Sequence, residues 1–257
     1  MRLSGLLLAA SLVAACSGSV AGSGQAAAQT RTLPPAFVTE TICRPAFTVD
    51  GERLEAGTAF VLKSPGPDGK ILLVTAQHLF GPSGGLDADI AWDAMPANVS
   101  AVTCEPLESE GPWKGGKAFA IPGAHGMSDV MALKDIAAFP LRWERASAVP
   151  RPLVLASKMP AAGERVWLVA QVIEGAPPSQ LLHPGKPVYD GRGLLQFVYD
   201  NPGLVLRATS GAPVVNAAGE LVGINLGGGR DRKTGELVGT AEDISVVRAA
   251  LGGLKTD

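Results

Sequence analysis

The hydrophobic positions of the chain fall into short runs separated by turn-forming residues. Residues 57–63 and 70–76 are two such runs around the turn SPGPDG, and residues 213–217 and 220–226 flank a second turn at Ala218-Gly219. Each pair predicts a β-hairpin. Further strands are expected at residues 98–104, 135–141, 152–156, 165–173, 194–199 and 203–207. Many short strands at regular spacing indicate an all-β barrel or sandwich.

The composition supports this interpretation. Of 257 residues, 32 are Gly and 20 are Pro, which favours many turns over long helices. Hydrophobic residues make up 46% of the chain, enough for a sizeable core. Residues 242–254, EDISVVRAALGGL, have an amphipathic helical spacing and predict a short closing helix.

The N-terminus carries a targeting pattern. Arg2 precedes an apolar run at residues 5–15, which is too short to span about 30 Å of hydrocarbon and predicts a signal peptide over residues 1–15. The run ends in Leu12-Val13-Ala14-Ala15-Cys16, which resembles a bacterial lipobox. That resemblance implies lipidation of Cys16 and export to the cell envelope, on the periplasmic or outer-membrane side, with the membrane as a partner. An ordinary secretory signal with a chance cysteine is the alternative.

Residues 17–35 are small and polar, and predict that residues 16–35 form a flexible tether in front of a folded domain at 36–257. Lipidation of Cys16 would leave one pair of cysteines, Cys43 and Cys104. In an oxidising compartment this pair can form a disulfide. Two buried free thiols are the alternative.

The charge pattern narrows the function classes. The net charge is −2 and no basic stripe is visible, so nucleic acid is not an expected partner. The 3 histidines show no metal-ligand spacing, and neither a metal nor another cofactor is expected. His125 and His183 lie in loop-like sequence, where we expect exposed side chains.

Two residues stand where chemistry could take place. His78 directly follows the strand predicted at 70–76, so a rigid scaffold can present its imidazole. Ser210 lies in ATSGAPV, a tight turn of small residues that a substrate carbonyl could approach. The N–H groups of Ser210 and Ala208 could both point at a developing oxyanion.

Taken together, these motifs resemble the trypsin-like (chymotrypsin-like) serine peptidases. GTAF at 57–60 with VTAQH at 74–78 is similar to the strands leading to the family's catalytic histidine, and TSGAPVVN at 209–216 is similar to its nucleophile turn. The resemblance covers roughly residues 40–250. It implies two six-stranded antiparallel barrels, divided near residues 145–150, with a short C-terminal helix.

The same resemblance implies an acid between the histidine and the serine. Asp135, which opens DIAAFPL, is preferred, and Asp129, which opens DVMALK, is the alternative. The expected function is serine endopeptidase activity on a protein or peptide substrate, with His78, Asp135 and Ser210 as the triad and Ala208 and Ser210 as oxyanion donors. The rival hypothesis is an inactive barrel protein that acts as an envelope scaffold.

By the same analogy, Leu204, Asn225 and Gly227 would line the substrate pocket. Two positions depart from the family pattern. Ala208 stands where the family has glycine, and an alanine there is strained. Thr209 replaces an acidic residue that pairs with a new N-terminal amine in zymogen-type members, so the protein is expected to be made in its final conformation.

Overall fold

The computed structural model describes residues 33–66, 68–126, 134–142, 150–161, 163–188 and 194–254. The predicted signal peptide, the lipidation site Cys16 and the alternative acid Asp129 lie outside the described residues, as does part of the predicted boundary at 145–150. Within the described residues, no helix is long and apolar enough to cross a membrane.

The first half of the described chain forms a closed antiparallel barrel of six strands in the order β1-β3-β4-β7-β6-β5, and β5 pairs back with β1. A further strand, β2, pairs with the outer end of β1. The strands are β1 (Ile42–Val49), β2 (Glu52–Glu55), β3 (Ala59–Lys63), β4 (Ile71–Thr75), β5 (Val99–Pro106), β6 (Trp113–Gly115) and β7 (Ala137–Arg142).

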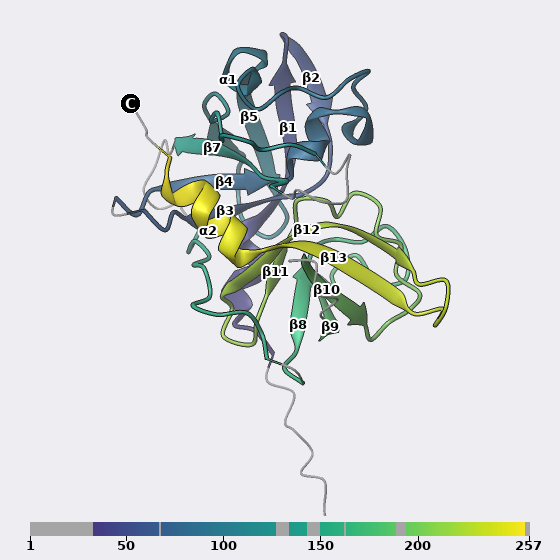
Figure 1. Cartoon of the computed structure of the whole chain (residues 1–257). Helices are drawn as coiled ribbons and strands as arrows, with labels where there is room; N and C mark the ends of the chain where they lie inside the picture. Colours follow the sequence, from purple (N-terminus) through teal and green to yellow (C-terminus); the bar gives the residue numbers. More distant parts are fainter. Residues whose placement is uncertain are drawn as a thin grey trace, which may run out of the picture. The chain divides into compact units, whose positions relative to one another are not determined.

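The second half forms another closed antiparallel barrel, in the order β10-β13-β12-β11-β8-β9 (Figure 1). Its strands are β8 (Val166–Val169), β9 (Leu182–Val188), β10 (Leu194–Tyr199), β11 (Pro213–Val215), β12 (Leu221–Arg230) and β13 (Leu237–Asp243). The predicted fold class, two six-stranded antiparallel barrels, is therefore confirmed.

Helical segments are short. They are η1 (Ala36–Thr41), η2 (Gln77–Phe80), η3 (Pro82–Gly84), α1 (Met95–Asn98) and α2 (Ile244–Gly252). The helix α2 is the predicted closing helix, and it begins where the Asp243 carboxylate accepts the N–H of Ser245 at 2.6 Å. Its buried residues Val247 and Leu251 pack into the hydrophobic cluster between the barrels.

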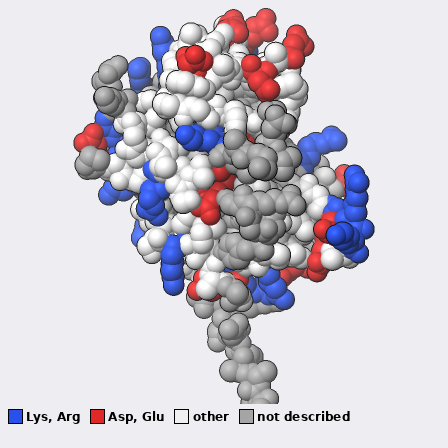
Figure 2. All heavy atoms as spheres, in the orientation of Figure 1, with Lys and Arg blue, Asp and Glu red and all other residues white. Residues whose placement is uncertain are grey.

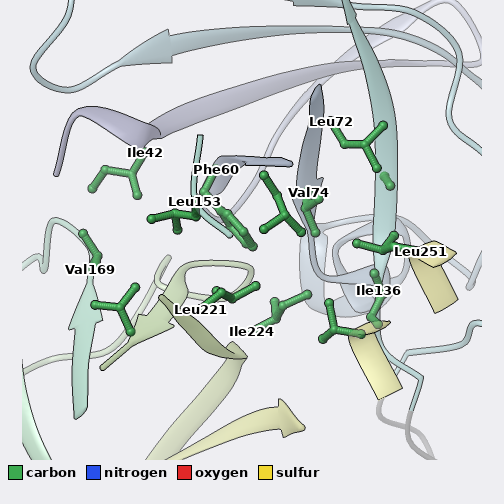
Figure 3. Close-up of a cluster of buried hydrophobic side chains, with 14 of the residues drawn as sticks. Ile42, Phe60, Leu72, Val74, Ile136, Leu153, Val169, Leu221, Ile224 and Leu251 are labelled. Carbon is green, nitrogen blue, oxygen red and sulfur yellow. The ribbon is translucent and has the colours of Figure 1, made fainter. Parts of the chain in front are cut away.

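Alternation along the strands separates three hydrophobic clusters. On β3, Ala59 and Val61 face the interior of the first barrel, whereas Phe60 and Leu62 face the second barrel. On β12, Val222 faces the interior of the second barrel, whereas Leu221 and Ile224 lie in the cluster between the barrels. Figure 3 shows the cluster between the barrels, with side chains of β3 and β4 opposite those of β8 and β12. These inner strands are buried on both faces, so they are continuously apolar in sequence.

Two expected strands are wrong. Residues 152–156 form only single bridges, from Leu153 to β3 and from Leu155 to β12, because this segment crosses from one barrel to the other. Residues 203–207 form a single bridge between Val205 and Glu174. Leu153 and Leu204 are buried in these connections, whereas Val154 and Val205 are exposed, so apolar sequence here does not mark a strand of a sheet.

Several strands gave no signal in the sequence. The strand β2 reads ERLE and is largely exposed, so it has no apolar run. Figure 2 shows acidic side chains gathered at the end of the molecule where β2 and α1 lie. The strand β9 contains His183, whose predicted exposure is wrong: its side chain is buried and Nε2 lies 2.9 Å from the carbonyl of Ala170. Burial lowers the pKa of His183.

The cysteines Cys43 and Cys104 form a disulfide, as predicted, rather than two free thiols. They lie on β1 and β5, the pair of strands that closes the first barrel. The bridge spans 61 residues of sequence. By the chain-entropy argument such a loop gives about 4 kcal/mol of stabilisation. The disulfide therefore stabilises the barrel that carries His78.

Candidate active site

His78 is positioned by the end of β4. Thr75 ends the strand, its hydroxyl donates to the carbonyl of Thr58 at 2.7 Å, and the chain then turns into the 3-10 helix η2. The imidazole side chain is 10% exposed, so most of its surface is buried. Gly126 packs so closely over the residue that a Cβ there would lie 2.9 Å from the Cβ of His78. The histidine is therefore closely packed and only slightly exposed.

Asp135 is fully buried directly before β7 and binds His78 twice. Its Oδ2 lies 2.6 Å from Nδ1 of the ring, and its Oδ1 accepts the backbone N–H of His78 at 2.8 Å. Because a carboxylate only accepts hydrogen bonds, this contact places the single ring hydrogen of a neutral imidazole on Nδ1, and Nε2 then has a free lone pair. Of the two acids considered from the sequence, Asp135 is thus the one that the structure brings to His78, and Asp129 lies outside the described residues.

The segment in front of Ser210 is a tight turn of the second barrel. The N–H of Thr209 donates to the carbonyl of Leu206 at 3.2 Å, and Ala208, the third residue of the turn, has φ +64°. Arg207 is not among the residues with positive φ, so the turn is type II. A type II turn rotates its central peptide by about half a turn relative to type I, which sets the direction of the Ala208 N–H.

This nucleophile turn, residues 206–212, is held by side chains from both barrels. From the first barrel, the hydroxyl of Thr58 donates to the carbonyl of Ala208 at 2.9 Å, and its N–H donates to the carbonyl of Ser210 at 2.8 Å. From β12, Nδ2 of Asn225 lies 2.9 Å from the carbonyl and 3.1 Å from the hydroxyl of Thr209. The Thr209 hydroxyl donates to Leu206 at 2.7 Å. Neutral hydrogen bonds thus fix the turn.

Among residues 208–212, the N–H groups of Ala208 and Ser210 have no partner in the described part of the chain. The intervening N–H of Thr209 is occupied, as are those of Gly211 and Ala212. Two donors two residues apart, at a partly exposed turn, can bind one oxygen atom carrying negative charge. These are the two donors predicted from the sequence.

The hydroxyl of Ser210 donates to the carbonyl of Leu226 on β12, at 3.3 Å. Within the described residues its hydrogen bonds do not include the imidazole of His78. The backbones on which the two side chains stand are nevertheless tied together. The serine's own carbonyl binds Thr58, and Thr58 in turn accepts from Thr75 near the end of β4.

Gly211 allows this approach between the barrels. Its φ is +81°, and a Cβ at this position would lie 2.1 Å from the hydroxyl of Thr75 and 2.3 Å from the carbonyl of Thr58. A larger residue would push the serine turn away from β4. The Ser-Gly pair is therefore required by packing as well as by turn geometry.

The three residues expected in a substrate pocket have different surroundings. Leu204 is buried in the core of the second barrel, and Asn225 is buried behind the nucleophile turn, on Thr209. Gly227, with φ +140°, lines a concavity of about 750 Å³ that also contains Leu226, Gly228, Val238 and Thr240. Leu226 is the residue whose carbonyl accepts from Ser210, so the concavity begins beside the serine.

Sequence reasoning missed one charged residue at the site, Glu242 on β13. It is fully buried, and its Oε2 accepts the backbone N–H of Asp135 at 2.8 Å. Burial raises the pKa of Glu242 to about 7, although the hydrogen bond from the Asp135 N–H lowers it; the charge of Asp135 raises it by a smaller amount. Alternation along LVGTAED puts Leu237 and Ala241 inside the second barrel and Glu242 on the opposite face of the strand, so no sequence signal indicated its burial. No group of three or more metal-ligating side chains occurs among the described residues.

The fold and these contacts define the class: a chymotrypsin-like double barrel with a His–Asp pair on the first barrel and a serine turn on the second. Solved structures similar to it include the active form of the Rv3671c protease from M. tuberculosis, at 16% identity and a TM-score of 0.49, covering 86% of this chain and 85% of that chain. The inactive form of the Rv3671c protease matches at 16% identity and a TM-score of 0.48, covering 85% and 91%. No protein-family model and no curated protein matches the sequence.

Proposed function

We propose that this protein is a serine endopeptidase that cleaves peptide bonds through an acyl-enzyme on Ser210. The observation that carries the proposal is the pairing of His78 with buried Asp135 through two hydrogen bonds, at 2.6 and 2.8 Å. This arrangement leaves Nε2 of a largely buried imidazole available as a base. Buried titratable groups with a specific charged partner are typical of functional sites.

The proposed reaction follows from the positions of the groups. The Ser210 hydroxyl turns from Leu226 to His78 when substrate binds, and its oxygen attacks the scissile carbonyl while Nε2 takes the proton. The N–H groups of Ala208 and Ser210 bind the oxyanion. Protonated His78 then gives its proton to the leaving amine, and Asp135 stabilises the imidazolium. Water, deprotonated by the same imidazole, hydrolyses the ester and regenerates the serine.

The concavity beside Leu226 is a suitable place for a substrate side chain. It is lined by apolar Val188, Val198 and Val238, and by glycines of β12 that leave the backbone accessible. Arg230, Asp231 and Glu236 also line it. A peptide substrate fits this mixture of apolar and charged lining better than a small apolar ester does.

The rival function is a binding or scaffolding protein of the cell envelope that no longer catalyses. One observation favours it: the Ser210 hydroxyl is bound to Leu226 instead of to His78. Export and lipid anchoring at Cys16 belong to both functions and stay predictions from the sequence.

A fluorophosphonate probe separates the two functions, because it reacts only with an activated serine. The folded wild-type protein should be labelled, and Ser210→Ala should lose both the label and all hydrolysis of a peptide library. Ser100→Ala is the matched control, since that hydroxyl also donates to a backbone carbonyl, Thr48 at 3.5 Å, but lies on β5. Labelling that survives in Ser210→Ala, or a folded wild-type protein that takes no label, would refute the proposal.

A further inference from the structure

Glu242 occupies an unusual position for a carboxyl group. It lies on β13 of the second barrel, yet its hydrogen bond goes to Asp135 of the first barrel, 107 residues earlier in the chain. Its partners in register on the neighbouring strands, Leu194 and Ile224, are apolar. A fully buried carboxyl group among apolar neighbours is expensive, so a structural role alone would be better served by an apolar residue.

The charged and titratable groups around Glu242 are few. Asp135 faces it from the segment before β7, Asp243 follows it on its own strand, and His125 acts on it from the segment that also packs over His78. The two carboxylates raise the pKa of Glu242 and the histidine lowers it, while burial is the largest influence. Its second oxygen, Oε1, is buried with no hydrogen-bond partner in the described part of the chain.

We propose that Glu242 is a positioning residue of the active site, which holds the backbone of Asp135 from the second barrel and whose negative charge stabilises the protonated imidazole of His78. The contact with Asp135 stands on the geometry alone, whereas its effect on the reaction rate rests on the proposed peptidase function.

The first part of the role is mechanical. Asp135 binds His78 through both carboxylate oxygens, so any shift of the aspartate's backbone moves the imidazole. The hydrogen bond from its N–H to Oε2 fixes that backbone at 2.8 Å. Because the bond crosses between barrels, it couples the position of the acid to the barrel that carries Ser210.

The second part is electrostatic. Ionised Glu242 places a second negative charge behind the His78–Asp135 pair, in a region without bulk water, where charges act strongly on one another. This charge favours the imidazolium that forms when His78 takes the proton of Ser210. Glu242 itself changes charge near neutral pH, so the strength of this effect depends on pH.

The test follows the imidazole directly, without substrate. In the full chain with ¹⁵N-labelled histidine, the ring signals of His78 are followed by NMR from pH 4 to 9, and His125→Gln aids their assignment. In Glu242→Gln the midpoint of the His78 titration should lie about half a pH unit or more below that of the wild-type protein, because a negative charge near the imidazolium is lost.

A matched control is Glu164→Gln. The Glu164 carboxylate also accepts a backbone N–H, that of Ala161 at 2.7 Å, but it is exposed and belongs to a turn of the second barrel. This variant should leave the His78 titration unchanged. Glu242→Asp, which keeps the charge, should restore the wild-type midpoint even where it lowers stability. An unchanged His78 titration in folded Glu242→Gln would overturn the proposal.

Rate measurements test whether Glu242 affects catalysis. In Glu242→Gln, kcat should fall about three- to tenfold with little change in KM, because the lost interaction is made with the imidazolium of the transition state. A shifted His78 titration in a protein that hydrolyses no peptide would refute the peptidase function and leave the role of Glu242 intact. An active wild-type enzyme in which Glu242→Gln leaves the His78 titration unchanged would support the peptidase function and refute the role of Glu242.

Discussion

The two halves of the site differ in how far they are assembled. The acid–base half, His78 with Asp135, is buried, doubly hydrogen-bonded and supported from behind by Glu242. The nucleophile half is partly exposed, contains a left-handed alanine, and keeps its hydroxyl on Leu226. Both halves lie at strand ends of closed barrels.

The two halves are stabilised by different contacts. The acid–base pair is complete without substrate because its groups satisfy one another, whereas two N–H donors of the serine turn remain open. Open donors and a strained residue are stable only because Thr58 and Asn225 hold the surrounding carbonyls. Substrate would supply the missing partner, as catalytic hydrogen bonds often tighten only in the complex.

The largest effect should come from breaking the acid–base half with Asp135→Asn. An amide in place of the carboxylate favours the wrong tautomer of His78, which leaves no base at Nε2. We expect kcat on a peptide substrate to fall by about 10⁴, with KM little changed. Asp50→Asn is the control, an exposed aspartate of the first barrel whose carboxylate accepts from Asn98 at 2.8 Å. A loss below tenfold would mean that the pair does not act as proposed.

A smaller effect is expected on the free energy of unfolding. It comes from Glu242, whose carboxyl group binds the backbone of Asp135 in the acid–base half. The pKa of Glu242 is raised from 4.5 to about 7, so the folded protein binds this proton more tightly than the unfolded chain does. Stability is therefore full below about pH 4.5, falls as pH rises towards 7, and is constant above it. The difference amounts to about 3 kcal/mol at most.

Urea denaturation at pH 5 and pH 8 measures this cost. The wild-type protein should lose more stability between these two values than Glu242→Gln, while Glu164→Gln should behave as the wild type does. Suppose that the free energy of unfolding falls equally between pH 5 and pH 8 in the wild-type protein and in Glu242→Gln. Ionisation of Glu242 would then not destabilise the folded protein.

The sequence predicted the halves unequally. His78 was found because it follows β4, and Ser210 because its turn leads into β11 and β12; these strands are buried on both faces, so their apolar runs are long. Glu242 was missed because its relation to Asp135 exists only when two barrels pack together. The same reason hides β2 and β9, whose polar, proline-containing or glycine-containing sequences become strands only through pairing with neighbours.

The smallest effect should come from Ala208→Gly, which relieves backbone strain in the nucleophile half. A left-handed φ of +64° costs an alanine about 1 kcal/mol, part of which is offset by the greater freedom of glycine in the unfolded chain. Since the type II turn already leaves the Ala208 N–H unpaired, kcat should change by no more than a few-fold, and the free energy of unfolding by less than about 1 kcal/mol. If the variant instead turned over substrate about a hundredfold faster, the donor would have to be turned away in the wild-type protein, since one oxyanion donor is worth about 10²–10³ in rate. The two halves would then differ in catalytic competence as well as in assembly.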